Sequence, residues 1–141
     1  MIRVYVWEPI HQLLDAPIGA MVGGDVHPGW VVPYDSNFRR FGHGGIEFIN
    51  VELENGTHIE NAYRSFWPAI GADFDTSAPG RVITDLSYDI GEESSRPNHV
   101  ITLGPGVNES RVFGRWSDMQ ARTPDFNGFD SNCCRAVASS I

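Results

Sequence analysis

Cysteine is scarce in this chain: there are two cysteines in 141 residues, and they are neighbours, Cys133 and Cys134. A disulfide between adjacent residues closes a strained ring, so disulfides cannot form the framework of this fold. The five histidines are scattered and lack the close spacing with one another or with cysteine that zinc sites use. We therefore expect no disulfide scaffold, no metal site and no cofactor.

Positive charge is scarce as well, with 10 basic side chains against 18 acidic ones, a net charge of −8 and a pI near 4.9. Nucleic acids and anionic membranes bind basic surfaces, so we expect no nucleic-acid partner. No apolar run approaches the roughly 20 residues that cross a bilayer. The start of the chain also lacks the basic segment and long apolar core of a signal peptide. We therefore expect no transmembrane segment, and synthesis in the cytoplasm without a signal peptide.

The composition is that of a globular protein, with 41% hydrophobic and 20% charged residues, and the length suits one domain. Repeats, low-complexity segments and linkers are lacking, so we predict a single domain over residues 1–141. Alternating apolar residues and turn signals predict strands, and a 3.6-residue period after Asn108 predicts a helix. The predicted strands are 2–8, 30–32, 42–53, 57–66, 81–86 and 99–103, the helix is 109–122, and residues 71–80, 92–98 and 123–131 are loops. The predicted fold class is α+β, with an antiparallel β-sheet packed against a few helices.

The dipeptide Asn55-Gly56 predicts a tight hairpin between the second and third of the longer strands. With a two-residue turn there, the numbers of paired residues add up to 111, so that His43 faces Pro68. Strict alternation then places Ser65 on the face opposite to His43, and Glu60 on the same face. A β-bulge would reverse this assignment.

The end of the chain predicts an amphipathic helix that begins at the cysteine pair. Its apolar stripe consists of Cys134, Val137, Ala138 and Ile141. Cys133 is rotated about 100° from this stripe, on the first turn, and candidate N-caps precede it at Asp130, Ser131 and Asn132. A thiol at a helix N-terminus is favoured as thiolate by the helix dipole and by unpaired N–H groups. Cys133 is therefore the predicted nucleophile.

A cysteine nucleophile needs a base, most often histidine. His43 is the predicted base because it begins a strand between Gly42 and Gly44-Gly45, where the missing side chains let another group approach. His99 also begins a strand, but it lacks such a glycine setting.

Several segments together resemble papain-like cysteine hydrolases of the circularly permuted branch, which includes relatives of NlpC-type peptidases and of lecithin:retinol acyltransferase. In that branch a histidine strand precedes a C-terminal cysteine helix. The chain looks most like a bacterial toxin or effector subgroup of it. The matching segments, in order, are Val4 to Pro9, Gly42-His43, Ser65-Phe66-Trp67-Pro68, Trp116 and Asn132-Cys133. Cys134 stands where the subgroup has a small polar residue.

The third catalytic residue is left open by the residues themselves. The resemblance favours Ser65, Glu60 is the reserve, and a plain Cys133–His43 dyad is the other alternative. Backbone N–H groups at the start of the cysteine helix would form the oxyanion hole. Phe66, Trp67 and Trp116 are expected more often in a core than in a cleft. The acidic stretch Asp85, Asp89, Glu92 and Glu93 is interpreted as a solvated loop.

The predicted function is that of a cysteine hydrolase, a peptidase or amidase that works through a thioester acyl-enzyme. The resemblance implies a secreted bacterial toxin or effector, exported by a dedicated secretion system, with a peptide or peptidoglycan substrate and an immunity or inhibitor protein as partner. One alternative is a lipid acyltransferase or phospholipase of the same fold, and another is a non-catalytic binding module. A zinc-dependent nucleobase deaminase is excluded because its H-x-E and P-C-x-x-C motifs are lacking.

Overall fold

The chain forms one antiparallel sheet with helices on both faces, as described by a computed structural model for residues 1–8, 42–69, 77–127 and 131–141. The order of strands across the sheet is β5-β1-β2-β3-β4-β6. In chain order the elements are β1 (Ile2–Trp7), β2 (His43–Glu52), β3 (His58–Pro68), β4 (Ala78–Ile83), α1 (Leu86–Glu92), β5 (His99–Thr102), α2 (Glu109–Ala121), β6 (Asp125–Phe126) and α3 (Cys133–Ser140). The predicted α+β class is confirmed, with the histidine strand before the cysteine helix.

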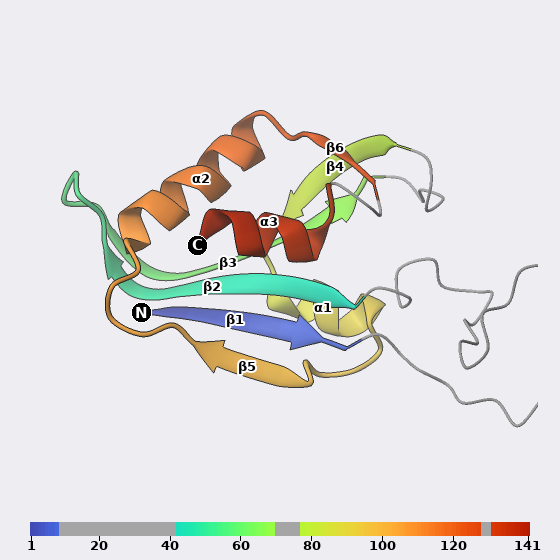
Figure 1. The fold of residues 1–141 in the computed structure, drawn as a ribbon, viewed down its shortest axis with the longest axis horizontal. Coiled ribbons are helices and arrows are strands. Elements are labelled where there is room, and N and C mark those ends of the chain that lie inside the picture. Colours follow the sequence, from blue (N-terminus) through green and yellow to red (C-terminus); the bar gives the residue numbers. More distant parts are fainter. Residues whose placement is uncertain (9–41, 70–76, 128–130) are drawn as a thin grey trace, which may run out of the picture.

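The two faces of the sheet carry different layers (Figure 1). Helices α2 and α3 cover one face, and the main core lies beneath them, formed by residues such as Phe48 of β2, Trp116 of α2 and Val137 of α3. The short helix α1 lies on the other face, where Leu86 and Ile90 pack against a smaller cluster of Tyr5, Trp7 and Tyr63. Strand alternation sends neighbouring side chains of β2 to opposite faces, so this strand contributes to both layers.

Two glycines at the start of β2 make close packing possible on both faces. A β-carbon at Gly45 would overlap the hydroxyl of Tyr63 on the α1 face. A β-carbon at Gly44 would lie 3.5 Å from the α-carbon of Cys134 on the α3 face. The prediction that the glycines beside His43 admit close neighbours is confirmed.

The register of the β2–β3 hairpin differs from the predicted one by one residue. The paired residues add up to 110, from Gly45 opposite Ser65 to Glu52 opposite His58. The turn has three residues between Leu53 and Thr57, with Gly56 at φ +80°, because a glycine in the left-handed region closes this longer loop without strain. The predicted two-residue turn was therefore wrong, and Ser65 lies on the His43 face without any bulge.

Helix α1 is one element that the sequence prediction missed, and the two-residue strand β6, inside the predicted loop 123–131, is another. The predicted strand 81–86 ends earlier, since β4 runs from Ala78 to Ile83, and Leu86–Glu92 is helical. Asp85 caps this helix, and its carboxylate accepts a 2.9 Å hydrogen bond from the backbone N–H of Ser87. Seven residues are too few for a clear 3.6-residue period, so the acidic stretch was misinterpreted as a solvated loop.

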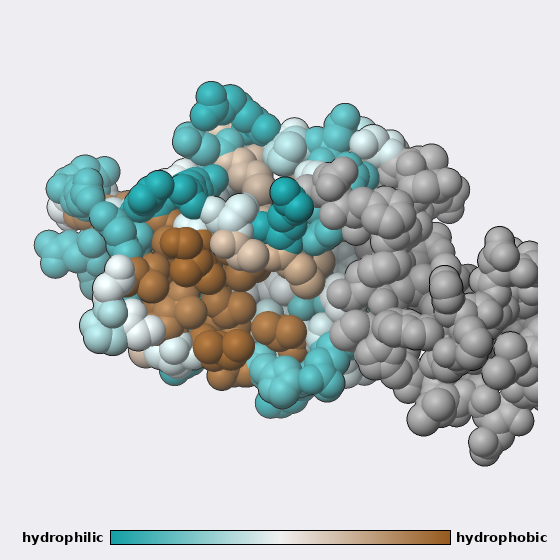
Figure 2. Space-filling view, in the orientation of Figure 1, coloured by the Kyte–Doolittle hydropathy of each residue, from teal (hydrophilic) through white to brown (hydrophobic). Residues whose placement is uncertain are grey.

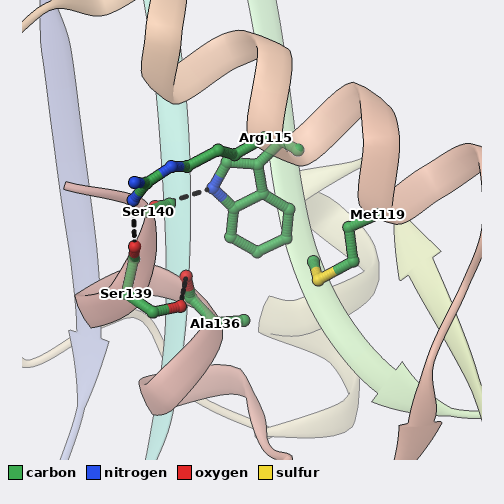
Figure 3. Close-up of a pocket in the computed structure, with 6 residues that line it drawn as sticks. Arg115, Met119, Ala136, Ser139 and Ser140 are labelled. Atoms are coloured by element: carbon green, nitrogen blue, oxygen red, sulfur yellow. Dashed lines mark hydrogen bonds between the residues drawn. The ribbon is translucent and has the colours of Figure 1, made fainter.

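The buried face of α3 also differs from the prediction. The buried residues are Cys133, Val137 and Ser140, whereas Cys134 is exposed and Ile141 is 50% exposed. Polar contacts with α2 favour this orientation of α3, in which its most apolar face is not the buried one (Figure 3). The indole N–H of Trp116 donates to Ser140 Oγ at 3.1 Å, and Arg115 donates to the carbonyl of Ser139. A cavity of about 290 Å³ lies between the two helices at this end, beside Met119.

Apolar side chains gather on the surface around the C-terminal end of α3 and over the neighbouring strands (Figure 2). Four large apolar residues are exposed among those described, Met1, Val100, Ile101 and Ile141. No helix in the described part of the chain is long and apolar enough to span a membrane. The predicted strand 30–32 lies outside the described residues.

We predict that Gly114→Ala stabilises the protein by about 0.5–1 kcal/mol, because Gly114 is exposed inside α2 with open space where a β-carbon would go. Gly45→Ala is the matched control and should destabilise the protein, since its methyl group meets Tyr63. Urea denaturation of the three proteins measures both changes. Equal stabilities would contradict the packing described for β2.

Candidate active site

A fully buried carboxylate, Asp89 of α1, is the centre of the polar cluster on the α1 face of the sheet. One oxygen, Oδ2, is 2.6 Å from His43 Nε2 and accepts a 2.5 Å hydrogen bond from the hydroxyl of Tyr63. The other, Oδ1, accepts hydrogen bonds from Ser65 Oγ at 2.9 Å and from the Trp67 indole N–H at 2.8 Å. The carboxylate thus replaces its lost hydration with protein donors, as a buried charge requires.

His43 is held in place on three sides. Its ring centroid lies 4.5 Å from that of Trp67 and 5.2 Å from that of Trp7, and only 3% of the residue is exposed. Trp7 is itself anchored by a 3.0 Å hydrogen bond to the carbonyl of Ser95. Because Nε2 faces Asp89, the ring has a defined orientation, and Nδ1 is the nitrogen left to exchange a proton elsewhere.

Cys133 reaches this cluster at the end of the sheet where β2 and β3 separate (Figure 1). Pairing between the two strands stops at Gly45 and Ser65, while β3 continues to Pro68 against β4. The N-terminus of α3 lies at this opening. The sulfur of Cys133 is 3.9 Å from the carbonyl oxygen of Gly42 and interacts with the backbone N–H of Gly44. The thiol therefore contacts the main chain on both sides of His43.

The two thiols interact and lose their protons as a pair. The pKa of Cys134 is lowered to about 7, mainly by a hydrogen bond from Cys133. The charge of protonated His43 also lowers this pKa, whereas burial and the charge of Glu93 raise it. The same contact, together with burial, raises the pKa of Cys133. Hydrogen bonds from the backbone N–H groups of Gly44 and Cys134 lower this pKa, but by less. The two pKa shifts have opposite directions and favour negative charge on Cys134 rather than on Cys133.

The N-terminus of α3 is capped by Asn132. Its side-chain oxygen accepts a 2.9 Å hydrogen bond from the N–H of Arg135, and its carbonyl accepts one from Ala136 at 2.9 Å. Of the three candidate caps, Asn132 is confirmed. The first backbone N–H groups of α3 have no partner within the helix itself, so they can point toward a bound oxyanion.

The predicted site residues are brought together in part. His43 and Cys133 meet at the same end of the sheet, and Ser65 faces the same cluster, although its hydroxyl donates to Asp89 rather than to His43. Glu60 is exposed and makes none of the hydrogen bonds of the Asp89 cluster. Phe66 and Trp116 are core residues, each 1% exposed.

Asp89 is the polar residue that sequence reasoning missed. The sequence prediction places it with Asp85, Glu92 and Glu93 in a solvated loop, but Asp89 is 0% exposed and Glu93 is 6% exposed. A short helix can bury some acidic residues while others, here Asp85 and Glu92, stay exposed, and the sequence alone does not say which. The available signal was the set of donors at every second position of β3, namely Tyr63, Ser65 and Trp67, which need an acceptor if that face of the strand is buried.

A second cavity, of about 410 Å³, lies on the α1 face and shares Tyr63 with the polar cluster. Its wall includes the carboxylates of Glu47 and Asp85 and the amide of Asn61. No group of three or more His, Cys, Asp or Glu side chains in the described ranges is arranged to hold a metal ion.

We predict that Asp89→Ala destabilises the protein by about 3–5 kcal/mol, because it leaves four donors of the buried cluster without their acceptor. Glu92→Ala is the matched control, three residues along the same helix and exposed, and should change stability by no more than about 0.5 kcal/mol. Chemical denaturation monitored by tryptophan fluorescence compares them. Similar losses for both variants would argue against the cluster as the anchor of α1.

A second prediction concerns the thiol pair. The alkylation rate of Cys134 by iodoacetamide should rise with pH and reach half its maximum near pH 7. Cys133→Ala removes the main cause of the lowered pKa, so the midpoint should move up toward that of an ordinary cysteine. Conversely, Cys134→Ala removes the main cause that raises the pKa of Cys133, whose midpoint should fall. Mass spectrometry assigns the sites, and midpoints that do not move would refute the coupling.

The chain matches no known protein family, no curated protein and no solved structure in the comparisons made.

Proposed function

We propose that the protein is a cysteine hydrolase of the permuted papain-like kind, with Cys133 as nucleophile, His43 as general base and acid, and Asp89 as the residue that orients His43. The observation that carries the proposal is the buried Asp89–His43 pair, 2.6 Å apart, together with the contact of the Cys133 sulfur with the main chain of Gly42 and Gly44, the two residues that flank His43. The reaction expected of these groups is acyl transfer to sulfur and then to water.

In the proposed first step His43 Nδ1 takes the proton from Cys133 while the sulfur attacks an amide or ester carbonyl. The raised pKa of Cys133 favours a thiol at rest, so the proton leaves as the bond to carbon forms. The carbonyl oxygen gains the negative charge and accepts hydrogen bonds from backbone N–H groups at the start of α3. Loss of the amine or alcohol, protonated by His43, gives a thioester.

In the second step water attacks the thioester, and His43 accepts a proton from the water molecule. The carboxylate of Asp89 stabilises the imidazolium in both steps and keeps its ring oriented. Ser65, Tyr63 and Trp67 act on Asp89, so the hydroxyl of Ser65 has a positioning role in this scheme. Cys134 is not required for either step.

The substrate class that we propose is a peptide or peptidoglycan amide, as the resemblance implies for a bacterial toxin or effector. The alternative is an ester of a lipid. The cavity on the α1 face, which Tyr63 lines together with Glu47, Asn61 and Asp85, has a polar wall. Such a wall is better suited to a polar substrate than to an acyl chain.

The test is to incubate the protein with purified peptidoglycan, a peptide mixture and phospholipid vesicles, and to identify released products and a covalent adduct on Cys133 by mass spectrometry. Cys133→Ala should abolish turnover and adduct. His43→Ala should lower turnover by at least about a hundredfold. Cys134→Ser is the matched control, and should retain turnover because it leaves Cys133, His43 and Asp89 in place.

Circular dichroism must show that each variant is folded. Turnover that survives Cys133→Ala but not Cys134→Ser would transfer the nucleophile's role to Cys134. If folded wild type forms no adduct and releases no product from any of the three materials, the non-catalytic binding module becomes the better account.

A further inference from the structure

The vicinal cysteines differ in their surroundings although they are one residue apart. Cys134, the second residue of α3, is exposed, whereas Cys133 beneath it is 7% exposed and contacts the main chain of β2. Their thiols are nevertheless in hydrogen-bond contact with each other. A reagent from solution therefore meets Cys134 first, and Cys133 is the only other thiol of the chain.

We propose that this pair is a reversible oxidation site, at which a hydroperoxide converts Cys133 and Cys134 into a vicinal disulfide. The inference deepens the proposed function, because the disulfide would occupy the sulfur that we assign as nucleophile. The oxidant is a small hydroperoxide, and the reductant that reverses the reaction is a dithiol.

The chemistry takes two steps. The Cys134 thiolate attacks the outer oxygen of ROOH; an S–O bond forms, the O–O bond breaks, and with one proton from water the products are the sulfenic acid of Cys134 and ROH. The Cys133 sulfur then attacks the sulfur of this sulfenic acid; the S–S bond forms, and hydroxide leaves with the thiol proton as water. In sum, two thiols and ROOH give a disulfide, ROH and water.

The position of the pair at the start of α3 makes the ring feasible. The backbone N–H groups of the first helical residues have no acceptor within the helix, so distorting this turn breaks fewer helical hydrogen bonds than distorting an interior one. The contacts at risk are those of Asn132 with Arg135 and Ala136. A disulfide between neighbours is strained, and strained disulfides are readily reduced. The modification is therefore expected to be reversible rather than a permanent crosslink.

The lowered pKa of Cys134, about 7, supports the first step, because a larger share of this thiol is then thiolate at pH 7 than of an ordinary cysteine. An ordinary cysteine has a few per cent thiolate at that pH. We therefore expect Cys134 in the folded protein to react with hydrogen peroxide roughly tenfold faster than a free thiol such as glutathione.

The experiment treats the reduced protein with hydrogen peroxide at pH 7, blocks remaining thiols with N-ethylmaleimide and digests with trypsin. Both cysteines fall in one fragment, Thr123 to Arg135, because Arg122 precedes it and Arg135 ends it. We expect this fragment to lose two hydrogens and to take up no maleimide. After dithiothreitol it should take up two.

Two variants separate the steps. Cys133→Ser lacks the resolving sulfur, so the sulfenic acid of Cys134 should accumulate, react with dimedone and proceed to sulfinic acid. Cys134→Ser lacks the exposed thiol, and its remaining cysteine should oxidise at least about tenfold more slowly than wild type. Wild type in concentrated urea is a further control, and there the rate should fall to that of a free thiol.

The proposal is overturned if the wild-type fragment gains oxygen atoms or joins a second chain instead of losing two hydrogens. It is also overturned if the folded and urea-unfolded chains oxidise at the same rate. These readouts need no turnover: a disulfide without hydrolase activity would refute the proposed function alone, and hydrolase activity without the disulfide would refute this inference alone.

Discussion

The buried carboxylate of Asp89 is the constraint on which the polar side of the fold depends. A charged group without water is costly unless donors surround it, and here the donors come from His43 on β2 and from Tyr63, Ser65 and Trp67 on β3. The carboxylate thereby ties α1 to two strands that are distant from it in the sequence. The same contacts orient His43, so the group that anchors the helix also prepares the proposed base.

The opening between β2 and β3 is the second condition for the site. If the two strands stayed paired to their ends, the sheet would separate the α3 face from the α1 face. Because pairing stops at Gly45 and Ser65, the first residue of α3 contacts the main chain around His43. Gly44 and Gly45 contribute by leaving space, on one face for α3 and on the other for Tyr63.

The predictions made from sequence succeeded where a local pattern was long and regular. Alternation located β1, β2, β3 and β5, and the helical period after Asn108 located α2, with its cap. These predictions failed where a single residue set the strand register or where the element was short. The hairpin turn contains one residue more than predicted, which moved Ser65 to the His43 face, and seven residues were too few to reveal α1 and its buried Asp89.

The sequence by itself determined the α+β class, the histidine strand and the cysteine helix with three candidate caps, because propensity, periodicity and capping act over a few neighbouring residues. Tertiary structure decided that Asp89 would be buried, because that depends on donors from β2 and β3 meeting α1. It also decided that Cys133 is buried and Cys134 exposed. Trp116 of α2 donates a hydrogen bond to Ser140, and this contact favours the burial of the Cys133 face of α3. The apolar pattern of α3 alone does not predict this orientation.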